Sequence, residues 1–240
     1  MRIDSQKSKI FFKKHSNDIV MVLPAYNESK TIEKVIEKLL VLDLQVIVVD
    51  DGSTDDTYKI VKKLLKQSEQ LSLYRHLFNR GVGATLKTGI EAALRKNPKV
   101  IVTFDADGQH HSKDIYFVSR PIIEGQADIV IGIRDFNVMP FRKSFGNRIM
   151  NIITLIFYGH LVIDSQSCFR AFNIKAALLM ELHYTGYGVC SEMVGEVFKH
   201  DLILTEVPIT TIYSDYSLSK GTGTKVGFKI LAKLIRDVFK

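Results

Sequence analysis

The feature that most constrains the fold of this chain is a regular alternation of short apolar runs and amphipathic stretches over its first half. The apolar runs are rich in Val, Ile and Leu and are predicted strands, at residues 19–23, 46–49, 71–77, 100–104 and 129–131. The stretches between them show helical spacing, at residues 31–42, 54–65, 83–95 and 112–124. Strands that are continuously apolar belong in a parallel sheet covered by helices on both faces. We therefore expect an α/β fold, a single Rossmann-like domain with a mostly parallel central sheet.

The second half is less regular. Helices are predicted at residues 145–163, 173–182 and 192–199, and a strand broken by a proline at 203–213. Residues 225–240 show a strongly patterned basic helix. The chain contains no internal repeat and no low-complexity linker, so we expect one domain over residues 1–220 and a basic amphipathic segment over residues 221–240.

Length and composition narrow the class of protein. A chain of 240 residues, 46% of them hydrophobic, suits one large domain. The beginning lacks the apolar core of a signal peptide, and no run reaches the roughly 18–20 apolar residues of a spanning helix. Cys168 and Cys190 are too few for a disulfide framework, so we expect a reducing, cytoplasmic compartment.

Polar side chains follow three of the predicted strands. Tyr26 and Glu28 come after the first strand, Asp51 after the second, and Asp105 and Asp107 after the fourth. A single Asp at a strand end is usually a turn or cap residue. Ligands of open parallel sheets bind beyond the carboxyl ends of the strands, however, so three such turns on one edge favour a binding site there.

The segment FDADGQHH, residues 104–111, indicates a metal site. Asp105 and Asp107 point the same way if the segment is extended, and their carboxylates repel each other unless a cation lies between them. A hard divalent ion such as Mg²⁺ or Mn²⁺ prefers oxygen ligands and bridges carboxylates to a diphosphate; Gln109 adds an amide oxygen. His110 and His111 leave Mn²⁺ or Zn²⁺ open. The structural alternative is an Asx-turn ahead of the next helix.

The metal and Arg134 would together offset the negative charge that develops when a nucleoside diphosphate leaves. Asp51 is placed to accept a hydrogen bond from a nucleotide base, and the Gly-containing loop 79–83 would let backbone approach a phosphate. Leu86 stands where a dinucleotide fingerprint needs its third glycine, and there is no Walker A motif, which disfavours an NAD enzyme.

These motifs together resemble the family 2 glycosyltransferases, abbreviated GT2. The matching segments are LPAYNE (23–28), VVDDGSTD (48–55), NRGVGATLKTG (79–89), DADGQH (105–110) and IGIR (131–134). The segment IDSQSCFRAF (163–172) is similar to D-x-x-S-G-F-R-A-Y of the dolichyl- and polyprenyl-phosphate sugar synthases. The resemblance implies a GT-A fold. It also implies metal-dependent, inverting transfer of a hexose from a GDP-mannose or UDP-glucose type of donor to a polyprenyl or dolichyl phosphate.

The resemblance also assigns residues. The implied nucleotide-sugar contacts are Pro24, Tyr26, Glu28, Val49, Asp51, Asp105, Ala106 and Arg134. The implied metal ligands are Asp105, Asp107 and Gln109, and the implied catalytic residues are Asp107, Arg134, Arg142 and Lys143. Arg142 or Lys143 would meet the acceptor phosphate, and Arg170 would be either a phosphate contact or part of a structural ion pair.

The chain departs from the family pattern in two places. Cys168 occupies the position of the usual glycine, where a left-handed backbone would be unfavourable. Residues 213–216 lack the arginine of the mannose-type enzymes, so the donor sugar stays open.

Two other functions are kept as alternatives. An ionised polyprenyl phosphate needs no general base, whereas a saccharide or lipid hydroxyl must lose a proton, and Glu192 is then the candidate base. A noncatalytic module that binds nucleotide sugar or lipid is disfavoured by the complete set of Asp105, Asp107, Gln109 and Arg134.

Two segments suggest attachment to a membrane. Arg142, Lys143 and Arg148 begin an apolar helix, and residues 225–240 combine a basic side with an apolar one. We expect a peripheral protein on the cytoplasmic face of the membrane. The alternative is an ordinary buried helix for the first segment and, for residues 225–240, a helix packed on the body of the protein with a solvated basic face. A nucleic-acid partner is disfavoured because aromatic side chains do not alternate with the basic ones. Homo-oligomer formation is left open.

Overall fold

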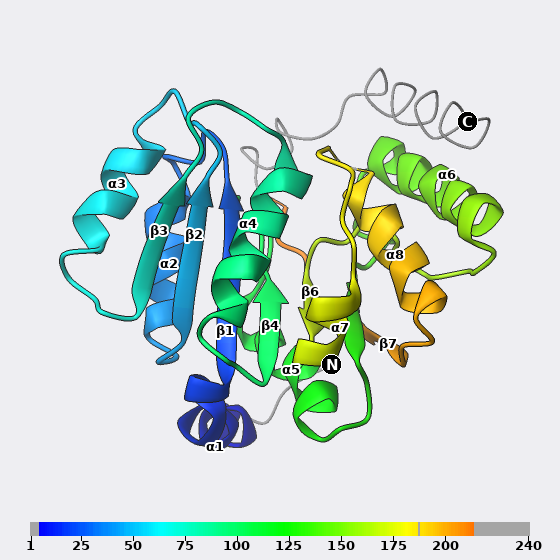
Figure 1. Cartoon of the computed structure of the whole chain (residues 1–240), viewed down its shortest axis with the longest axis horizontal. Coiled ribbons are helices and arrows are strands. Elements are labelled where there is room, and N and C mark those ends of the chain that lie inside the picture. Colours follow the sequence, from blue (N-terminus) through cyan, green and yellow to red (C-terminus); the bar gives the residue numbers. More distant parts are fainter. Residues whose placement is uncertain (1–4, 187, 214–240) are drawn as a thin grey trace.

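The computed structural model describes residues 5–186 and 188–213, which form helices packed on a central sheet (Figure 1). The seven strands of that sheet lie in the order β3-β2-β1-β4-β6-β5-β7. All pairs are parallel except those made by β6, which runs antiparallel to both of its neighbours. The strands are β1 (Ile19–Ala25), β2 (Gln45–Asp50), β3 (Leu71–Arg75), β4 (Val100–Thr103), β5 (Ile129–Ile133), β6 (Arg170–Phe172) and β7 (Leu204–Pro208). The expected mostly parallel sheet is confirmed.

Helices cover both faces of the sheet, with α4 in front of it and α2 behind it in Figure 1. They are α1 (Ser5–His15), α2 (Ile32–Leu40), α3 (Thr57–Leu64), α4 (Val82–Leu94), α5 (Ile115–Ile123), α6 (Phe141–Tyr158), α7 (Ile174–Leu179) and α8 (Val189–Lys199). Along β1, Met21 and Leu23 join a core with α2, α3 and α5, whereas Val20 and Val22 join a core with α4, α7 and α8. Burial on both faces is why the strand sequences are continuously apolar.

Two elements differ from the sequence interpretation. The N-terminal segment, where the sequence analysis predicted no helix, contains helix α1; Phe12 is buried there and the ring of Phe11 meets the edge of Tyr116 at 5.0 Å between centroids. Strand β6 was not predicted at all, because three residues are too short to show a period. The ends of two further elements differ from the predicted ones. Helix α6 ends at Tyr158, before Gly159 with φ of 75°, and not at residue 163; β7 ends at Pro208 and not at residue 213.

The predicted boundary at residue 220 and the predicted basic helix at 225–240 lie outside the described residues. Within the described part of the chain, no helix is long and apolar enough to cross a bilayer.

Candidate active site

The three polar turns meet at one edge of the sheet, as expected. Strands β2, β1 and β4 are neighbours in the sheet, so Glu28, Asp51 and Asp105 follow adjacent carboxyl ends. Because β6 is antiparallel, its first residue, Arg170, pairs with Thr103 at the end of β4. The loop that precedes β6 therefore lies on this same edge, which we call the rim.

Asp105 is held on the rim by a histidine. Its Oδ2 lies 2.9 Å from Nε2 of His110, which is itself buried between the rings of Phe104 and Phe169 at 5.4 and 4.9 Å. Burial would raise the pKa of Asp105, but the bond to His110 and the charges of His110 and Arg134 lower it. Asp105 is therefore a fixed anion on the rim.

The surroundings of Asp107 raise its pKa, whereas those of Asp105 lower it. Burial and the charge of Asp105 raise its pKa, although its carboxylate accepts hydrogen bonds from the backbone N–H, at 3.0 Å, and the side-chain amide of Gln109. An ionised Asp105 that opposes the ionisation of Asp107 fits a divalent cation, which would offset that repulsion. The described residues contain no preformed group of three His, Cys, Asp or Glu side chains, so further ligands would have to come from Gln109, water or the substrate.

A buried aspartate that the sequence analysis did not name holds Arg134. Nε and Nη2 of Arg134 donate to Oδ2 and Oδ1 of Asp164, each at 2.8 Å, and Asp164 is fully buried. Burial would lower the pKa of the guanidinium, but Asp164 and the charge of Asp105 raise it. The bidentate pair fixes the orientation of a cation next to Asp105. The motif D-x-x-S contained this residue, but its partner lies 30 positions away and gave no local signal.

Helix α6 begins beside the rim. Burial lowers the pKa of Lys143, the charge of Asp107 raises it and that of Arg134 lowers it further. Arg142 belongs to the same first turn, but its side chain lies outside the described residues. Lys143 therefore lies within the electrostatic influence of Asp107 and Arg134.

Asp51 accepts hydrogen bonds from inside the protein. Its Oδ1 receives Nδ1–H of His76 at 2.6 Å and the backbone N–H of Arg80 at 3.0 Å, and its Oδ2 receives the backbone N–H of Gly81 at 2.8 Å. Nε2 of His76 lies 3.0 Å from Oγ1 of Thr88. Besides any contact with a base, Asp51 therefore fixes the loop 79–83.

The other predicted nucleoside contacts differ in how far they are exposed to solvent. Tyr26 is 41% exposed just beyond β1, and the Glu28 carboxylate accepts from the Thr31 hydroxyl at 3.2 Å. Pro24 lies within β1, while Val49 and Ala106 have almost no exposed surface. The last two would therefore shape the floor of a nucleoside site rather than present side chains to it.

The carboxylate of Glu192, the alternative general base, accepts hydrogen bonds from the backbone. Its two carboxylate oxygens accept the N–H groups of His183 and Tyr184 at 2.8 and 3.0 Å, and the residue is buried in α8. The segment it holds meets α4, because the N–H of Gly83 donates to the carbonyl of Thr185 at 2.7 Å. A groove of about 360 Å³ runs between this segment and α4. Glu192 therefore has the contacts of a structural residue.

Arg170 is also structural. The side chain is fully buried and donates to the carbonyls of Ser167 and Ser165 at 2.8 and 2.6 Å. It has no exposed surface for a phosphate, so the alternative of a phosphate contact does not hold. Its role is to stabilise the loop that carries Asp164.

An open, mostly parallel sheet with carboxylates at its carboxyl edge, and with an arginine fixed by Asp164 on the same rim, fits the GT-A class of glycosyltransferases. The model of "Glycosyl transferase family 2" matches residues 20–178, and the chain belongs to this family. It is therefore a glycosyltransferase, as the sequence predicted.

Individual relatives support the assignment. The chain is 39% identical over 237 residues to the UDP-N-acetylglucosamine--dolichyl-phosphate N-acetylglucosaminyltransferase of Methanococcus voltae, covering 90% of this chain and 94% of that protein. It is 23% identical to the polyprenol monophosphomannose synthase of Mycolicibacterium smegmatis, covering 86% and 82%. The fold matches glucosyl-3-phosphoglycerate synthase from Mycobacterium tuberculosis, solved with Mn²⁺ and UDP, with a TM-score of 0.72 at 17% identity over 98% of this chain and 83% of that one.

Proposed function

We propose that this enzyme transfers a sugar from a nucleotide-diphosphate donor to a polyprenyl phosphate, with a divalent ion at Asp105 and Asp107. The observation that carries the proposal is the charge pattern of the rim. The charge of Asp105 raises the pKa of Asp107, the charge of Arg134 lowers that of Asp105, and both Asp107 and Arg134 act on the pKa of Lys143. This arrangement suits a diphosphate on one side and an acceptor phosphate on the other. The names of the relatives from Methanococcus voltae and Mycolicibacterium smegmatis support the acceptor class.

In this proposal each group of site residues has its own role in the transfer. Asp105, Asp107 and Gln109 would hold Mg²⁺ or Mn²⁺, which when bound supplies positive charge to the diphosphate. Arg134, fixed by Asp164, offsets the charge that develops on the leaving group. Lys143, with Arg142 in the same turn, receives the acceptor phosphate. An acceptor oxygen attacks the anomeric carbon, and the nucleoside diphosphate leaves from the opposite side, which inverts the configuration.

No general base is required, because the acceptor phosphate is already ionised at neutral pH. The contacts of Glu192 favour this reading over the alternative of a saccharide or lipid hydroxyl acceptor. The donor sugar stays open among the GDP-mannose and UDP-glucose types, and UDP-N-acetylglucosamine joins them because the Methanococcus voltae relative bears its name.

We propose further that the enzyme works as a peripheral protein at the cytoplasmic face of a membrane. One face of α6 exposes large apolar side chains: Phe141, Phe145, Ile149, Ile152 and Ile156, exposed by 83, 56, 39, 55 and 72%. We call this set the α6 apolar face. Since α6 also begins at the rim, the face would bring a lipid-linked phosphate to Lys143.

The test is a donor panel with the full chain. GDP-mannose, UDP-glucose and UDP-N-acetylglucosamine are each incubated with a short polyprenyl phosphate and Mg²⁺ or Mn²⁺, and the glycolipid is detected by mass spectrometry. One donor should give a polyprenyl-phosphate sugar, and EDTA should abolish its formation. Transfer to a neutral lipid alcohol or a saccharide, with none to the phosphate, would contradict the proposal.

A further inference from the structure

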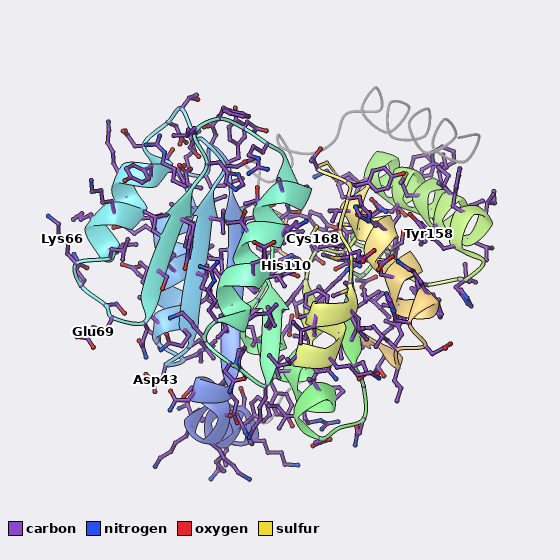
Figure 2. The ribbon with its side chains drawn as sticks, viewed as in Figure 1. Asp43, Lys66, Glu69, His110, Tyr158 and Cys168 are labelled. Carbon is purple, nitrogen blue, oxygen red and sulfur yellow. The ribbon has the colours of Figure 1, made fainter. Side chains whose placement is uncertain are left out.

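The chain's two cysteines lie side by side although 22 positions separate them. The Sγ atoms of Cys168 and Cys190 are 3.1 Å apart, and both are free thiols. Cys190 is buried in the first turn of α8, whereas Cys168 is half-buried in the loop before β6, near the centre of the molecule (Figure 2). A thiol pair at this separation needs only a small movement to become a disulfide, for which the sulfur atoms must approach to about 2.05 Å.

The pair sits beneath the rim. The carbonyl of Cys168 accepts the hydroxyl of Thr103 at 2.6 Å, at the end of β4. The hydrogen bond from Cys168, and then the positive charges of Arg170 and Arg134, lower the pKa of the Cys190 thiol against the opposing effects of burial and of the charge of Asp105. A thiolate at Cys190 is therefore stabilised by a hydrogen-bond donor and nearby cations, and its half-buried partner Cys168 is the side of the pair that a small oxidant reaches.

We propose that Cys168 and Cys190 are a modification site, a dithiol that a small peroxide converts reversibly into a disulfide and that thereby lowers the activity of the enzyme. The sulfur of Cys190, as thiolate, attacks one oxygen of hydrogen peroxide; the O–O bond breaks, hydroxide leaves, and a sulfenic acid forms. The sulfur of Cys168 then attacks the sulfur of the sulfenic acid and loses its proton, and water leaves as the S–S bond forms. In total two thiols are oxidised and one peroxide is reduced to two waters.

The loop that contains Cys168 links this chemistry to the rim. It also contains Asp164, which orients Arg134, and the carbonyls of Ser165 and Ser167 that hold Arg170. Closing the sulfurs from 3.1 Å to bonding distance shifts this loop or the start of α8 by up to about 1 Å. A displacement of about that size in catalytic positioning lowers turnover by up to about 100-fold. This effect on turnover rests on the proposed function, whereas the bond itself does not.

The experiment treats the reduced full chain with hydrogen peroxide and measures the intact mass. The expected result is a loss of two hydrogens, and trypsin should then yield the peptides 149–170 and 176–199 joined to each other and released by dithiothreitol. Transferase activity should fall about 10-fold or more and return on reduction. Cys168→Ser and Cys190→Ser should each show no cross-linked peptide and no reversible loss.

Several outcomes would overturn the proposal. A gain of oxygen without the joined peptides, or no reaction at either sulfur, would contradict the disulfide. The mass is measured on the wild-type chain, so this conclusion does not depend on the folding of a variant. A complete disulfide with unchanged turnover would contradict the effect on the enzyme. A reduced chain without transferase activity would instead count against the proposed function, while the mass measurement would still decide the existence of the bond.

Discussion

At the scale of single residues, the rim carries a carboxylate whose ionisation the fold opposes. Burial and the charge of Asp105 raise the pKa of Asp107 above its ordinary value of 3.8. A carboxyl group whose pKa is higher in the folded than in the unfolded protein destabilises the fold as the pH rises above the pKa of the unfolded state. If Asp107 holds a cation as proposed, function and stability are opposed at this position.

Asp107→Asn tests the effect of this carboxylate on both stability and turnover. Without metal at pH 7 the variant should have a higher melting temperature than the wild type, and the difference should vanish below about pH 4, where the wild-type carboxyl is protonated. Turnover should fall about 100-fold or more, because a ligand of the cation is lost. Asp56→Asn, an exposed aspartate paired with Lys59, is the matched control and should alter neither property. Full turnover in Asp107→Asn would remove the metal assignment.

Glu192→Gln separates a structural carboxylate from a general base. The amide keeps one acceptor oxygen but turns an NH₂ group towards an N–H donor, so the free energy of unfolding should drop by about 1–3 kcal/mol. The turnover number of the folded enzyme should stay within a few-fold of the wild type. Glu91→Gln, at an exposed position of α4, should leave both quantities unchanged. Unchanged stability with abolished turnover would instead favour a hydroxyl acceptor.

At the scale of elements, the start of α4 and the segment 182–185 touch so closely that only glycine fits between them. A Cβ atom on Gly83 would lie 1.9 Å from the carbonyl oxygen of Tyr184, which is held in turn by Glu192. Gly83→Ala should therefore lower the free energy of unfolding by about 1–3 kcal/mol. Gly146, inside α6, has open space around it, so Gly146→Ala should raise stability by about 0.4–1 kcal/mol. Urea denaturation measures both; equal effects would mean that the contact does not constrain the loop.

The α6 apolar face is predicted to bind lipid. Changing Phe145, Ile152 and Ile156 to Ser should reduce cosedimentation of the full chain with liposomes that contain anionic lipid, because membrane binding scales with apolar area. Val41→Ser with Ile203→Ser, at exposed apolar positions on other elements, is the control and should sediment like the wild type. Equal sedimentation of the α6 variant would place lipid binding elsewhere, with residues 225–240 as the remaining candidate.

The elements also show what the sequence could predict. β1, β2 and β4 were foreseeable because burial on both faces makes nearly every position apolar, and the acidic turns that follow them marked the rim. β6 was not foreseeable, since three residues carry no period and its two antiparallel pairings depend on distant strands. The contacts of Asp164 with Arg134 were hidden for the same reason. Local patterns report burial, whereas these contacts join residues that lie far apart in the sequence.

At the scale of the whole molecule, the rim is assembled from two parts of the sheet. The strands β1, β2 and β4 supply the acidic turns, while β5 and the loop before β6 supply Arg134 and the Asp164 that holds it. The antiparallel β6 joins the two parts by pairing with β4 on one side and β5 on the other. In the proposed function, nucleotide and metal would meet groups from both parts, and each ligand should favour the binding of the other.

This coupling is measurable by thermal unfolding. Metal alone would relieve the repulsion between Asp105 and Asp107, and a nucleoside diphosphate alone would meet these carboxylates without the cation between them, so each should raise the melting temperature only slightly. Together, at about 100 times the dissociation constant, they should stabilise the fold by about 2.7 kcal/mol, a rise of about 5–10 °C for a chain of this length. Since coupling is reciprocal, metal should tighten the nucleotide by the same factor by which the nucleotide tightens metal. Asp107→Asn should keep the nucleotide shift and lose the excess. A strictly additive response in the wild-type chain would show that the two ligands do not share the rim.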